Sequence, residues 1–373
     1  MRILHVADRL PGRGGAYTWM RGILDGLDGH HEQTLVVGEV AADAESLRLP
    51  ARLVVREGLE SRTPAPVELD ELVAEVRPHA VHLHNVMNPV VLEWAAARPG
   101  RLLTVQDHRY FCPTRGKWTL DGKVCLRAMS REVCTTCFED QAYFGEVLGL
   151  TERRLAAVRR LPVTVLSRYM RAELVAAGVP ASSIYVVPPF VHDLDVSARA
   201  DGPPCVLFVG RLAESKGVRD AVKAWRRSGV SLPLVLAGTG PLRAELEAEA
   251  ALAKGPPLEV LGWVERDRLA ALYQRAGALI FPSRWQEPFG IVGIEALSFG
   301  VPVVAWESGA VHEWHPGPGL VHWGDVGALA RALGKYVGRR LLLLPRYERD
   351  EAIGRLTVLY GRLAGRATGV RGV

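Results

Sequence analysis

Two glutamates separated by seven residues stand out in the stretch FPSRWQEPFGIVGIE, residues 281–295. Glu287 comes just before a Pro-Phe-Gly turn, and Glu295 falls in the apolar helical pattern that follows. The first turn of a helix has unpaired N–H groups and the positive end of the helix dipole, so it favours a bound anion. The stretch predicts a phosphate site with a carboxylate on either side that can bind hydroxyls. An acidic strand-to-helix turn without a ligand fits the same letters equally well.

Two cations and a glycine turn follow the first two strand-like runs of the second half. Arg211 and Lys216 come after the run 206–209, and Gly238 opens a Gly-Thr-Gly-Pro turn after 234–237. In parallel α/β sheets, ligands bind at the carboxyl ends of the strands. Arg can hold phosphate oxygens through two bonds, whereas Lys supplies a point charge. Together with the two glutamates, these residues predict a site for a phosphate and hydroxyls, the groups that a sugar nucleotide carries.

Strand-like and helical segments alternate along both halves of the chain. The apolar runs lie at 3–7, 34–37, 80–83, 102–105 and 163–166, and then at 206–209, 234–237, 259–261, 279–281 and 303–305. This alternation predicts an α/β fold with parallel sheets. The first run leads into a glycine turn and then a helical pattern, which is the opening of a doubly wound unit. Gly14 and Gly15 in that turn lack the full dinucleotide-binding spacing, but they would let backbone approach a phosphate closely.

The length of 373 residues is too great for one ordinary core and suits two domains. A proline-bearing stretch marks the boundary, so domains at 1–190 and 191–373 are predicted. The net charge of +5 is modest, and no basic run interleaved with aromatics indicates nucleic acid. No apolar run has membrane-spanning length and the first residues lack a signal-peptide pattern, so we expect a cytoplasmic enzyme. Membrane contact would be peripheral at most, through the basic stretch 153–171. The oligomeric state is not indicated.

The ordered series of motifs resembles the retaining glycosyltransferases of family 4. The matching letters are GGA after the first strand, VHLHN, GRLAESKG, AGTGPL, LGWV and, above all, EPFGIVGIEALSFGVPVVAWESG. The series covers nearly the whole chain and is far more specific than any single motif in it. The resemblance implies the GT-B fold, in which two Rossmann-like domains with parallel sheets face a central cleft. It also implies that the N-terminal domain takes the acceptor, that the C-terminal domain binds the nucleotide sugar, and that the final helix, around 347–363, returns to the N-terminal domain.

The resemblance implies a role for each matched residue. Glu287 would contact the donor sugar near its reacting face, and Glu295 would hold the ribose hydroxyls. Arg211 and Lys216 would bind the diphosphate and neutralise the charge that grows on it as the glycosidic bond breaks, so no catalytic metal is expected. The further expected donor-binding residues are Gly14, Gly15, Gly238, Phe289, Gly290, Ile291 and Val292.

The activity implied is transfer of a hexose or N-acetylhexosamine, with retention, from a UDP- or GDP-linked sugar. The acceptor would be a hydroxyl of a glycan or of a small natural product. A nucleotide-sugar epimerase or hydrolase of the same fold stays open, because it would need the same donor-binding residues. A non-catalytic binding protein is less expected, since it would be free to lose them. The sequence does not decide the donor base, the sugar or the acceptor.

The chain departs from the family pattern after the run 102–105. Related sequences often have His-Asp there, with the His reaching toward the sugar, whereas this chain has Gln106, Asp107 and His108. Gln106 takes the aligned place, and His108 has the same side-chain parity if the strand continues. His108 is therefore predicted to be the active-site residue of the N-terminal domain. Gln106 is the alternative candidate for that role. In the other alternative, His108 is packed in the interior or faces solvent and has no role in the active site.

Four of the five cysteines lie just downstream, in a predicted insertion at about 109–140. Cys112, Cys125, Cys134 and Cys137 have the spacing C-x12-C-x8-C-x2-C, which is typical of a tetrahedral thiolate site. Because the intervening letters are loop-like, we expect a structural zinc ion to hold them. An iron–sulfur cluster, disulfides and unliganded thiols are the alternatives. The insertion follows His108 closely, so it is expected to shape acceptor binding.

A second candidate metal site is weaker. His82 and His84 fall on one face of a predicted strand, an arrangement that can bind a metal. Ordinary packing of the strand is the favoured interpretation.

Overall fold

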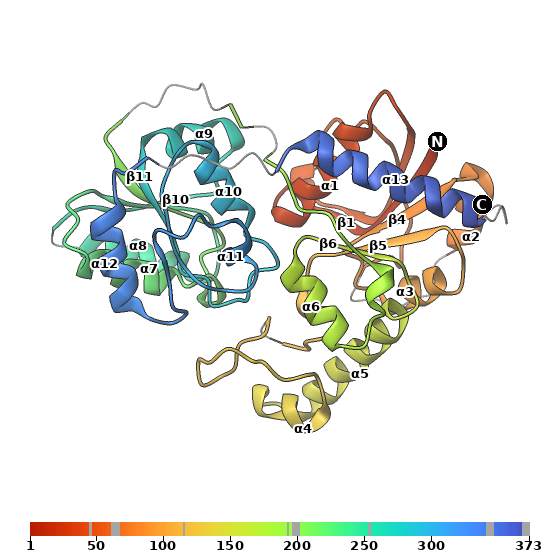
Figure 1. Cartoon of the computed structure of the whole chain (residues 1–373), viewed down its shortest axis with the longest axis horizontal. Coiled ribbons are helices and arrows are strands. Elements are labelled where there is room, and N and C mark those ends of the chain that lie inside the picture. Colours follow the sequence, from red (N-terminus) through yellow and green to blue (C-terminus); the bar gives the residue numbers. More distant parts are fainter. Residues whose placement is uncertain are drawn as a thin grey trace. The chain divides into compact units, whose positions relative to one another are not determined.

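The computed structural model describes residues 1–44, 47–60, 68–114, 116–191, 194–195, 202–252, 255–340 and 347–367. These residues form two compact units, each built on one parallel sheet with flanking helices (Figure 1). The N-terminal unit takes the described residues of Met1–Gly116, Leu126–Phe190 and Tyr347–Val373. The C-terminal unit takes those of Lys117–Cys125 and Val191–Arg346. The predicted α/β class with two parallel-sheet domains is confirmed.

The N-terminal unit contains a seven-stranded sheet in the order β3-β2-β1-β4-β5-β6-β7. Its strands are β1 (Arg2–Leu10), β2 (Glu32–Val40), β3 (Arg52–Val55), β4 (Ala80–His84), β5 (Arg101–Val105), β6 (Val163–Val165) and β7 (Ile184–Val186). All neighbouring strands pair in parallel. The strand order reverses between β1 and β4, which is where this architecture places its ligands.

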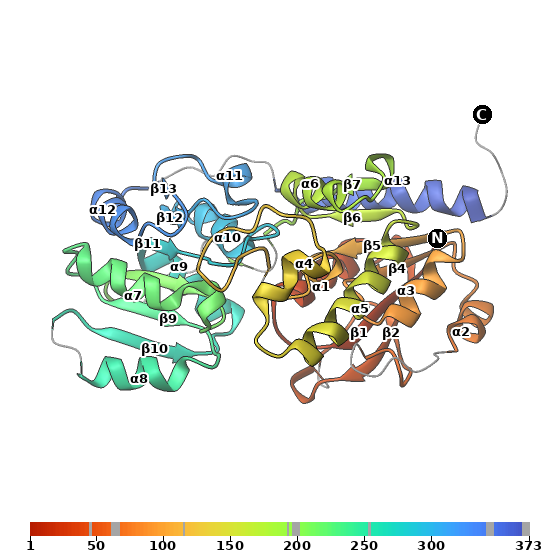
Figure 2. The same ribbon diagram turned by 90° about the horizontal axis from the view of Figure 1, so that it is seen from below.

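The helices of the N-terminal unit are α1 (Gly15–Leu27), α2 (Leu69–Val76), α3 (Pro89–Ala96), α4 (Arg131–Cys134), α5 (Gln141–Val158), α6 (Arg168–Ala176) and α13 (Arg349–Ala367). Capping side chains fix several helix starts: Asn88 accepts from the Val90 N–H at 2.9 Å, and Ser167 from the Met170 N–H at 3.1 Å. Helix α13 contacts α1 and β4, so the end of the described chain belongs to this unit (Figure 2).

The C-terminal unit contains a six-stranded sheet in the order β10-β9-β8-β11-β12-β13. Its strands are β8 (Cys205–Val209), β9 (Leu234–Ala237), β10 (Leu258–Gly262), β11 (Ala276–Phe281), β12 (Val303–Trp306) and β13 (Leu320–Val321). Its helices are α7 (Val218–Arg227), α8 (Arg243–Leu252), α9 (Arg266–Arg275), α10 (Ile291–Ser298), α11 (Val311–Trp314) and α12 (Val326–Tyr336). Here the order reverses between β8 and β11. Buried apolar side chains such as Phe208, Ile280 and Trp225 form the core between the sheet and its helices.

Short 3₁₀ turns connect some of these elements, at Ala42–Ala44, His108–Tyr110, Thr135–Cys137, Ala181–Ser183 and Glu214–Lys216. Among the described helices, none is both long and apolar enough to cross a bilayer.

Three histidines are buried in the N-terminal sheet, and they should make the unit sensitive to acid. Burial lowers the pKa of His5 to about 3 and holds the pKa of His82 and of His84 well below the ordinary value. In the unfolded chain these groups bind protons below about pH 6.5. The folded state therefore loses stability as the pH falls below that value. Asp8 acts in the opposite direction, because burial raises its pKa to about 7. The three imidazoles lower the stability at acid pH by more than the one carboxyl raises it.

We expect the free energy of unfolding to fall between pH 7.5 and pH 5.5, as measured by urea unfolding. Each buried imidazole contributes a slope of up to about 1.4 kcal/mol per pH unit. His5→Gln should make the dependence shallower, whereas the same change at the exposed His30 should leave it as in the wild type. A midpoint that does not move between the two pH values would contradict the expectation.

Candidate functional site in the C-terminal unit

Four loops meet at the carboxyl edge of the C-terminal sheet because β8, β9, β11 and β12 are parallel neighbours. Backbone hydrogen bonds tie these loops together. The Leu212 N–H donates to the Thr239 carbonyl at 2.9 Å, and the Trp285 N–H donates to the Ser215 carbonyl at 2.9 Å. The loops after β8, β9 and β11 are therefore held as one layer at the edge where the strand order reverses.

Glu287 lies in the loop after β11 and forms a partly buried ion pair with Lys216 from the loop after β8. Its Oε1 accepts from the Lys216 Nζ at 2.7 Å and from the Ser283 Oγ at 2.6 Å. The glutamate side chain is 6% exposed and the lysine side chain 31%. Bonds of this kind to a charged acceptor are about twice as strong as neutral ones, so they fix the direction of both side chains. The sequence predicted both residues, and the structure brings them together.

The backbone around Glu287 is equally constrained. The Ala310 N–H donates to its carbonyl at 2.9 Å, and the Gly309 N–H donates to the Gln286 Oε1 at 2.9 Å. A Cβ atom added at Gly309 would lie 2.4 Å from the Glu287 carbonyl oxygen, so only glycine allows this approach. The loop after β12 thus supports the loop that carries the carboxylate.

Glu295 lies on α10 and is held by two residues from α9 that the sequence analysis did not identify. Its Oε1 accepts from the Arg266 Nη1 at 2.7 Å, and its Oε2 accepts from the Tyr273 OH at 2.9 Å. Burial and the neighbouring Glu295 raise the pKa of Tyr273 well above its ordinary value, so the phenol stays a donor. Each carboxylate oxygen keeps a second lone pair that can accept from a ligand hydroxyl.

Helix α10 begins at Ile291, directly after Gly290, which has a φ of 95°. The N–H groups of Ile291 and Val292 fall in the first turn, where a helix offers no acceptor of its own. Trp314 fixes the entry to this helix, because its Nε1 donates to the Phe289 carbonyl at 2.6 Å. The predicted donor-binding positions 289–292 therefore span the entry to α10 and its first two residues, between the two glutamates in the sequence.

Arg211 and Gly238 lie at the ends of β8 and β9. The Arg211 side chain is exposed, in contrast to the half-buried Lys216. A Cβ atom at Gly238 would lie 1.8 Å from the Gly210 carbonyl oxygen, so glycine is needed there for the close approach of the two loops. Gly238 therefore has a packing role, and its donor-binding role stays a prediction.

Gly14 and Gly15 belong to the N-terminal unit, at the start of α1. Gly14 has a φ of 104°, which favours glycine, and a Cβ atom at either position would meet nothing within 4 Å. Both positions are therefore open to a ligand, as their predicted role requires.

His108 also lies in the N-terminal unit, where it is completely buried. Its Nε2 lies 3.1 Å from the Tyr169 OH, and its ring packs edge-on against Phe111. This is the packed alternative to the predicted orientation toward a sugar. Gln106, the alternative residue, is only partly buried at the end of β5. An active-site role for either stays a prediction.

The structure gives the predicted zinc site no support. Among the described residues, no cysteine Sγ belongs to a group of three or more ligand atoms that lie within 4.8 Å of one another. Cys125 falls in the segment that groups with the C-terminal unit, whereas Cys112, Cys134 and Cys137 belong to the N-terminal unit. None of the five cysteines forms a disulfide.

Ordinary packing holds the cysteine-bearing segment instead. Cys134 is buried against Phe144 and Leu148, and Trp118 is buried and forms an antiparallel bridge with Val124. The Arg284 guanidinium lies 5.9 Å from the centre of the Trp118 ring.

Comparison with known proteins agrees with this geometry. Residues 192–314 match the family model described as Glycosyl transferases group 1. The chain is similar to the D-rhamnosyltransferase WbpZ of Pseudomonas aeruginosa, with 38% identity over 109 residues, or 29% of this chain and 28% of that protein. The chain thus spans less than a third of the length of the first curated relatives that it matches.

Two solved structures share the fold over almost the entire length. Alr3699/HepE of Anabaena in complex with UDP-glucose has a TM-score of 0.65 and 17% identity, covering 97% of this chain and 100% of that one. The lipopolysaccharide outer core galactosyltransferase WaaB has a TM-score of 0.58 and 17% identity, covering 99% and 98%. The chain therefore has the GT-B fold, and its residues 192–314 match the model of the group 1 glycosyl transferases.

Proposed function

We propose that the chain is a glycosyltransferase that moves a hexose or N-acetylhexosamine from a UDP- or GDP-linked sugar to an acceptor hydroxyl of a glycan or small natural product. The observation that carries the proposal is the Lys216–Glu287 pair, 2.7 Å apart, at the carboxyl edge of a sheet within the group 1 domain. The pair supports the proposal because a cation that could bind phosphate and a carboxylate that could accept from sugar hydroxyls lie in one layer of loops.

The chemistry follows from these charges. As the bond between the anomeric carbon and the diphosphate breaks, negative charge grows on the leaving oxygen. Lys216, Arg211 and the first-turn N–H groups of α10 would stabilise that charge. Because Lys216 and the first-turn N–H groups are held in place before the reaction, they need little reorganisation, and we expect no divalent cation to be required. We expect the acceptor hydroxyl to attack on the face that the diphosphate leaves, with retention of configuration.

The two glutamates would bind different parts of the donor. Glu287 would accept hydrogen bonds from the hydroxyls of the transferred sugar, and Glu295 would accept them from the ribose. Gly14 and Gly15 would approach the phosphates from the N-terminal unit, with the acceptor also bound there. This assigns the domains at 1–190 and 191–373 to acceptor and donor. The similarity to transferases such as WbpZ favours transfer over the epimerase or hydrolase alternative.

The test is to incubate the purified chain with UDP- and GDP-sugars, with and without a panel of acceptors, and to measure nucleotide release. A transferase releases nucleotide in proportion to acceptor. A hydrolase releases it without acceptor, and an epimerase changes the sugar without release; either result would refute the proposal. Excess EDTA should leave the rate unchanged, and NMR of the product should show the anomeric configuration of the donor.

Glu295→Gln should weaken donor binding rather than the chemical step. We expect KM for the nucleotide sugar to rise by about 10- to 100-fold, in keeping with about 1.5–3 kcal/mol for a hydrogen bond to a charged group. Tyr273→Phe removes one donor to the same carboxylate, so its KM should move in the same direction by less. A variant with reduced kcat and unchanged KM would contradict the ribose-binding role. Steady-state kinetics across donor concentrations distinguish the outcomes.

A further inference from the structure

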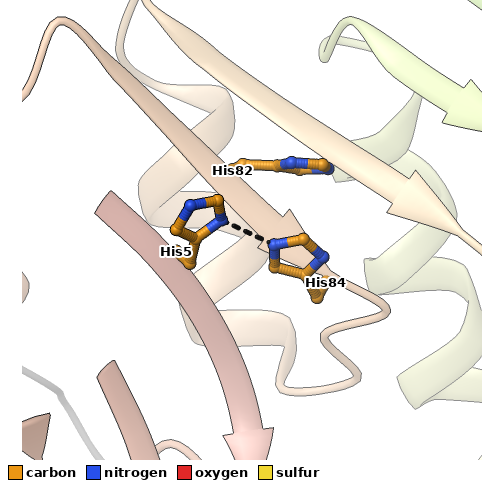
Figure 3. Close-up of side chains that lie close together, drawn as sticks. All are labelled: His5, His82 and His84. Carbon is orange, nitrogen blue, oxygen red and sulfur yellow. Dashed lines mark hydrogen bonds between the residues drawn. The ribbon is translucent and has the colours of Figure 1, made fainter. Parts of the chain in front are cut away.

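Three histidines meet in the N-terminal sheet, outside the site described above (Figure 3). His82 and His84 point to one face of β4 because side chains alternate along a strand. His5 on the neighbouring β1 pairs with His82 in the parallel register and joins them on that face. One ring nitrogen from each lies within 4.8 Å of the others, and in the described part of the chain no other candidate group of metal ligands is found.

We propose that His5, His82 and His84 form a structural binding site for a divalent transition-metal ion of the zinc type. The group offers three imidazoles and no carboxylate. Imidazole ligands suit zinc, cobalt, nickel and copper, whereas magnesium and calcium require oxygen ligands. Three histidines around one ion are an established donor set for zinc.

Two ring nitrogens of this cluster have no hydrogen-bond partner among the described residues, and two others face each other. The His5 Nδ1 lies 2.9 Å from the His84 Nε2, so the two nitrogens share one proton (Figure 3). The outer nitrogens, His5 Nε2 and His84 Nδ1, are buried and make no hydrogen bond within the described structure. Whichever ring donates, one outer N–H or lone pair stays unpaired on each ring, at a cost of about 1–3 kcal/mol for a buried donor. An ion at the two inner nitrogens would replace the hydrogen bond between them and leave each outer nitrogen as an N–H donor.

The surroundings of the rings suit ligation. The Gln33 side chain lies beside His5, and its buried Oε1 has no hydrogen-bond partner in the described part of the chain, so it could accept from the outer His5 N–H of the ion-bound ring. The two nitrogens of His82 lie 2.6 Å from the Thr104 Oγ1 and 2.7 Å from the Tyr360 OH. An ion bound at Nε2 would replace the bond to Thr104, while Nδ1 would keep the Tyr360 hydroxyl as its partner. Outer partners of this kind orient metal-binding histidines.

The protonation state also suits a metal ion. Burial, and then repulsion by the neighbouring imidazoles, lowers the pKa of His84 and of His82, so the rings are neutral at pH 7. Neutral imidazole is the form that binds metals, so no histidine of the cluster has to lose a positive charge before the ion binds. The ion would link β1 to β4 and, through Tyr360, to α13, which gives it a structural role in this unit.

The test is a titration of the chelator-treated, tag-free full chain with Co²⁺ at pH 7.5, followed by its visible absorption bands and by competition with Zn²⁺. We expect one equivalent to bind and to raise the melting temperature. His84→Gln and His5→Gln should each weaken binding by at least about 100-fold. His315→Gln changes a buried histidine of the C-terminal unit and should bind as the wild type does.

Circular dichroism of each variant establishes that it is folded. Absence of stoichiometric Co²⁺ binding by the wild type would overturn the proposal whatever the variants do. A folded His84→Gln or His5→Gln protein that binds Co²⁺ with wild-type affinity would overturn it as well.

Discussion

Glu287→Gln should lower kcat for sugar transfer by about 10³-fold, the upper range for removal of one preorganised electrostatic group. The carboxylate holds Lys216 at 2.7 Å and is itself nearly enclosed, so neutralising it removes both a hydroxyl acceptor and the fixed direction of the cation. Because Gln can still accept from Ser283 and Lys216 remains partly solvated, the free energy of unfolding should change by only about 1–2 kcal/mol. The loss is therefore expected in the chemistry and not in folding.

The matched control is Glu245→Gln, which makes the same chemical change at an exposed glutamate on α8 that pairs with Arg219. Its kcat and KM should equal those of the wild type. Nucleotide release at saturating donor gives kcat, and the dependence on donor concentration gives KM. If Glu287→Gln kept more than a third of the wild-type kcat, the proposed site would be refuted.

Much of the C-terminal site follows from the sequence because its residues lie on loops after parallel strands. Apolar runs predict β8 and β11, and parallel strands carry their carboxyl ends to one edge. Lys216 and Glu287 are distant in the sequence, yet they meet because β8 and β11 are neighbours in the sheet. Arg266 and Tyr273 escaped prediction for a physical reason. They lie within α9, an ordinary amphipathic helix in which nothing in the letters shows that two side chains face a buried carboxylate.

At His108 the structure differs from the premise of the parity argument. Its predicted direction assumed that the strand continues past Val105, but β5 ends there. The Asp107 side chain then accepts from the Arg109 N–H at 2.9 Å and begins a 3₁₀ turn, which carries His108 into the interior. The cysteine spacing predicts a metal site that the structure does not support, and Cys125 lies in a segment that groups with the C-terminal unit.

The histidine cluster shows the opposite case, in which the sequence contains part of a group and the fold completes it. Strand parity predicts that His82 and His84 share a face, and the structure confirms that they do. His5 enters only through the register of β1 against β4, which a single sequence does not reveal. The structure thus adds His5 to the two histidines that the sequence analysis names, which gives three candidate metal ligands.

Gly217→Ala should both destabilise the C-terminal unit and impair transfer, because this position joins the two loops that carry Lys216 and Glu287. Gly217 has a φ of 66°, and a Cβ atom there would lie 1.8 Å from the Pro282 carbonyl oxygen. The left-handed backbone costs an alanine about 1–2 kcal/mol. The shift needed to relieve the overlap costs about 1–3 kcal/mol more. That shift moves the loop of Lys216 away from the loop of Glu287, and a misplacement of about 1 Å can lower the rate by about 10²-fold.

Gly229→Ala separates the two causes. Gly229 has a φ of 72°, but a Cβ atom there meets nothing within 4 Å, so this variant carries the backbone cost without the overlap. We expect it to lose about 1–2 kcal/mol of stability and to keep wild-type kcat. Urea unfolding and nucleotide-release kinetics on both variants make the comparison. If the two alanine variants were equally stable and equally active, the contact between Gly217 and Pro282 would not hold the loops in register. The pairing of Lys216 with Glu287 would then have to depend on their side chains alone.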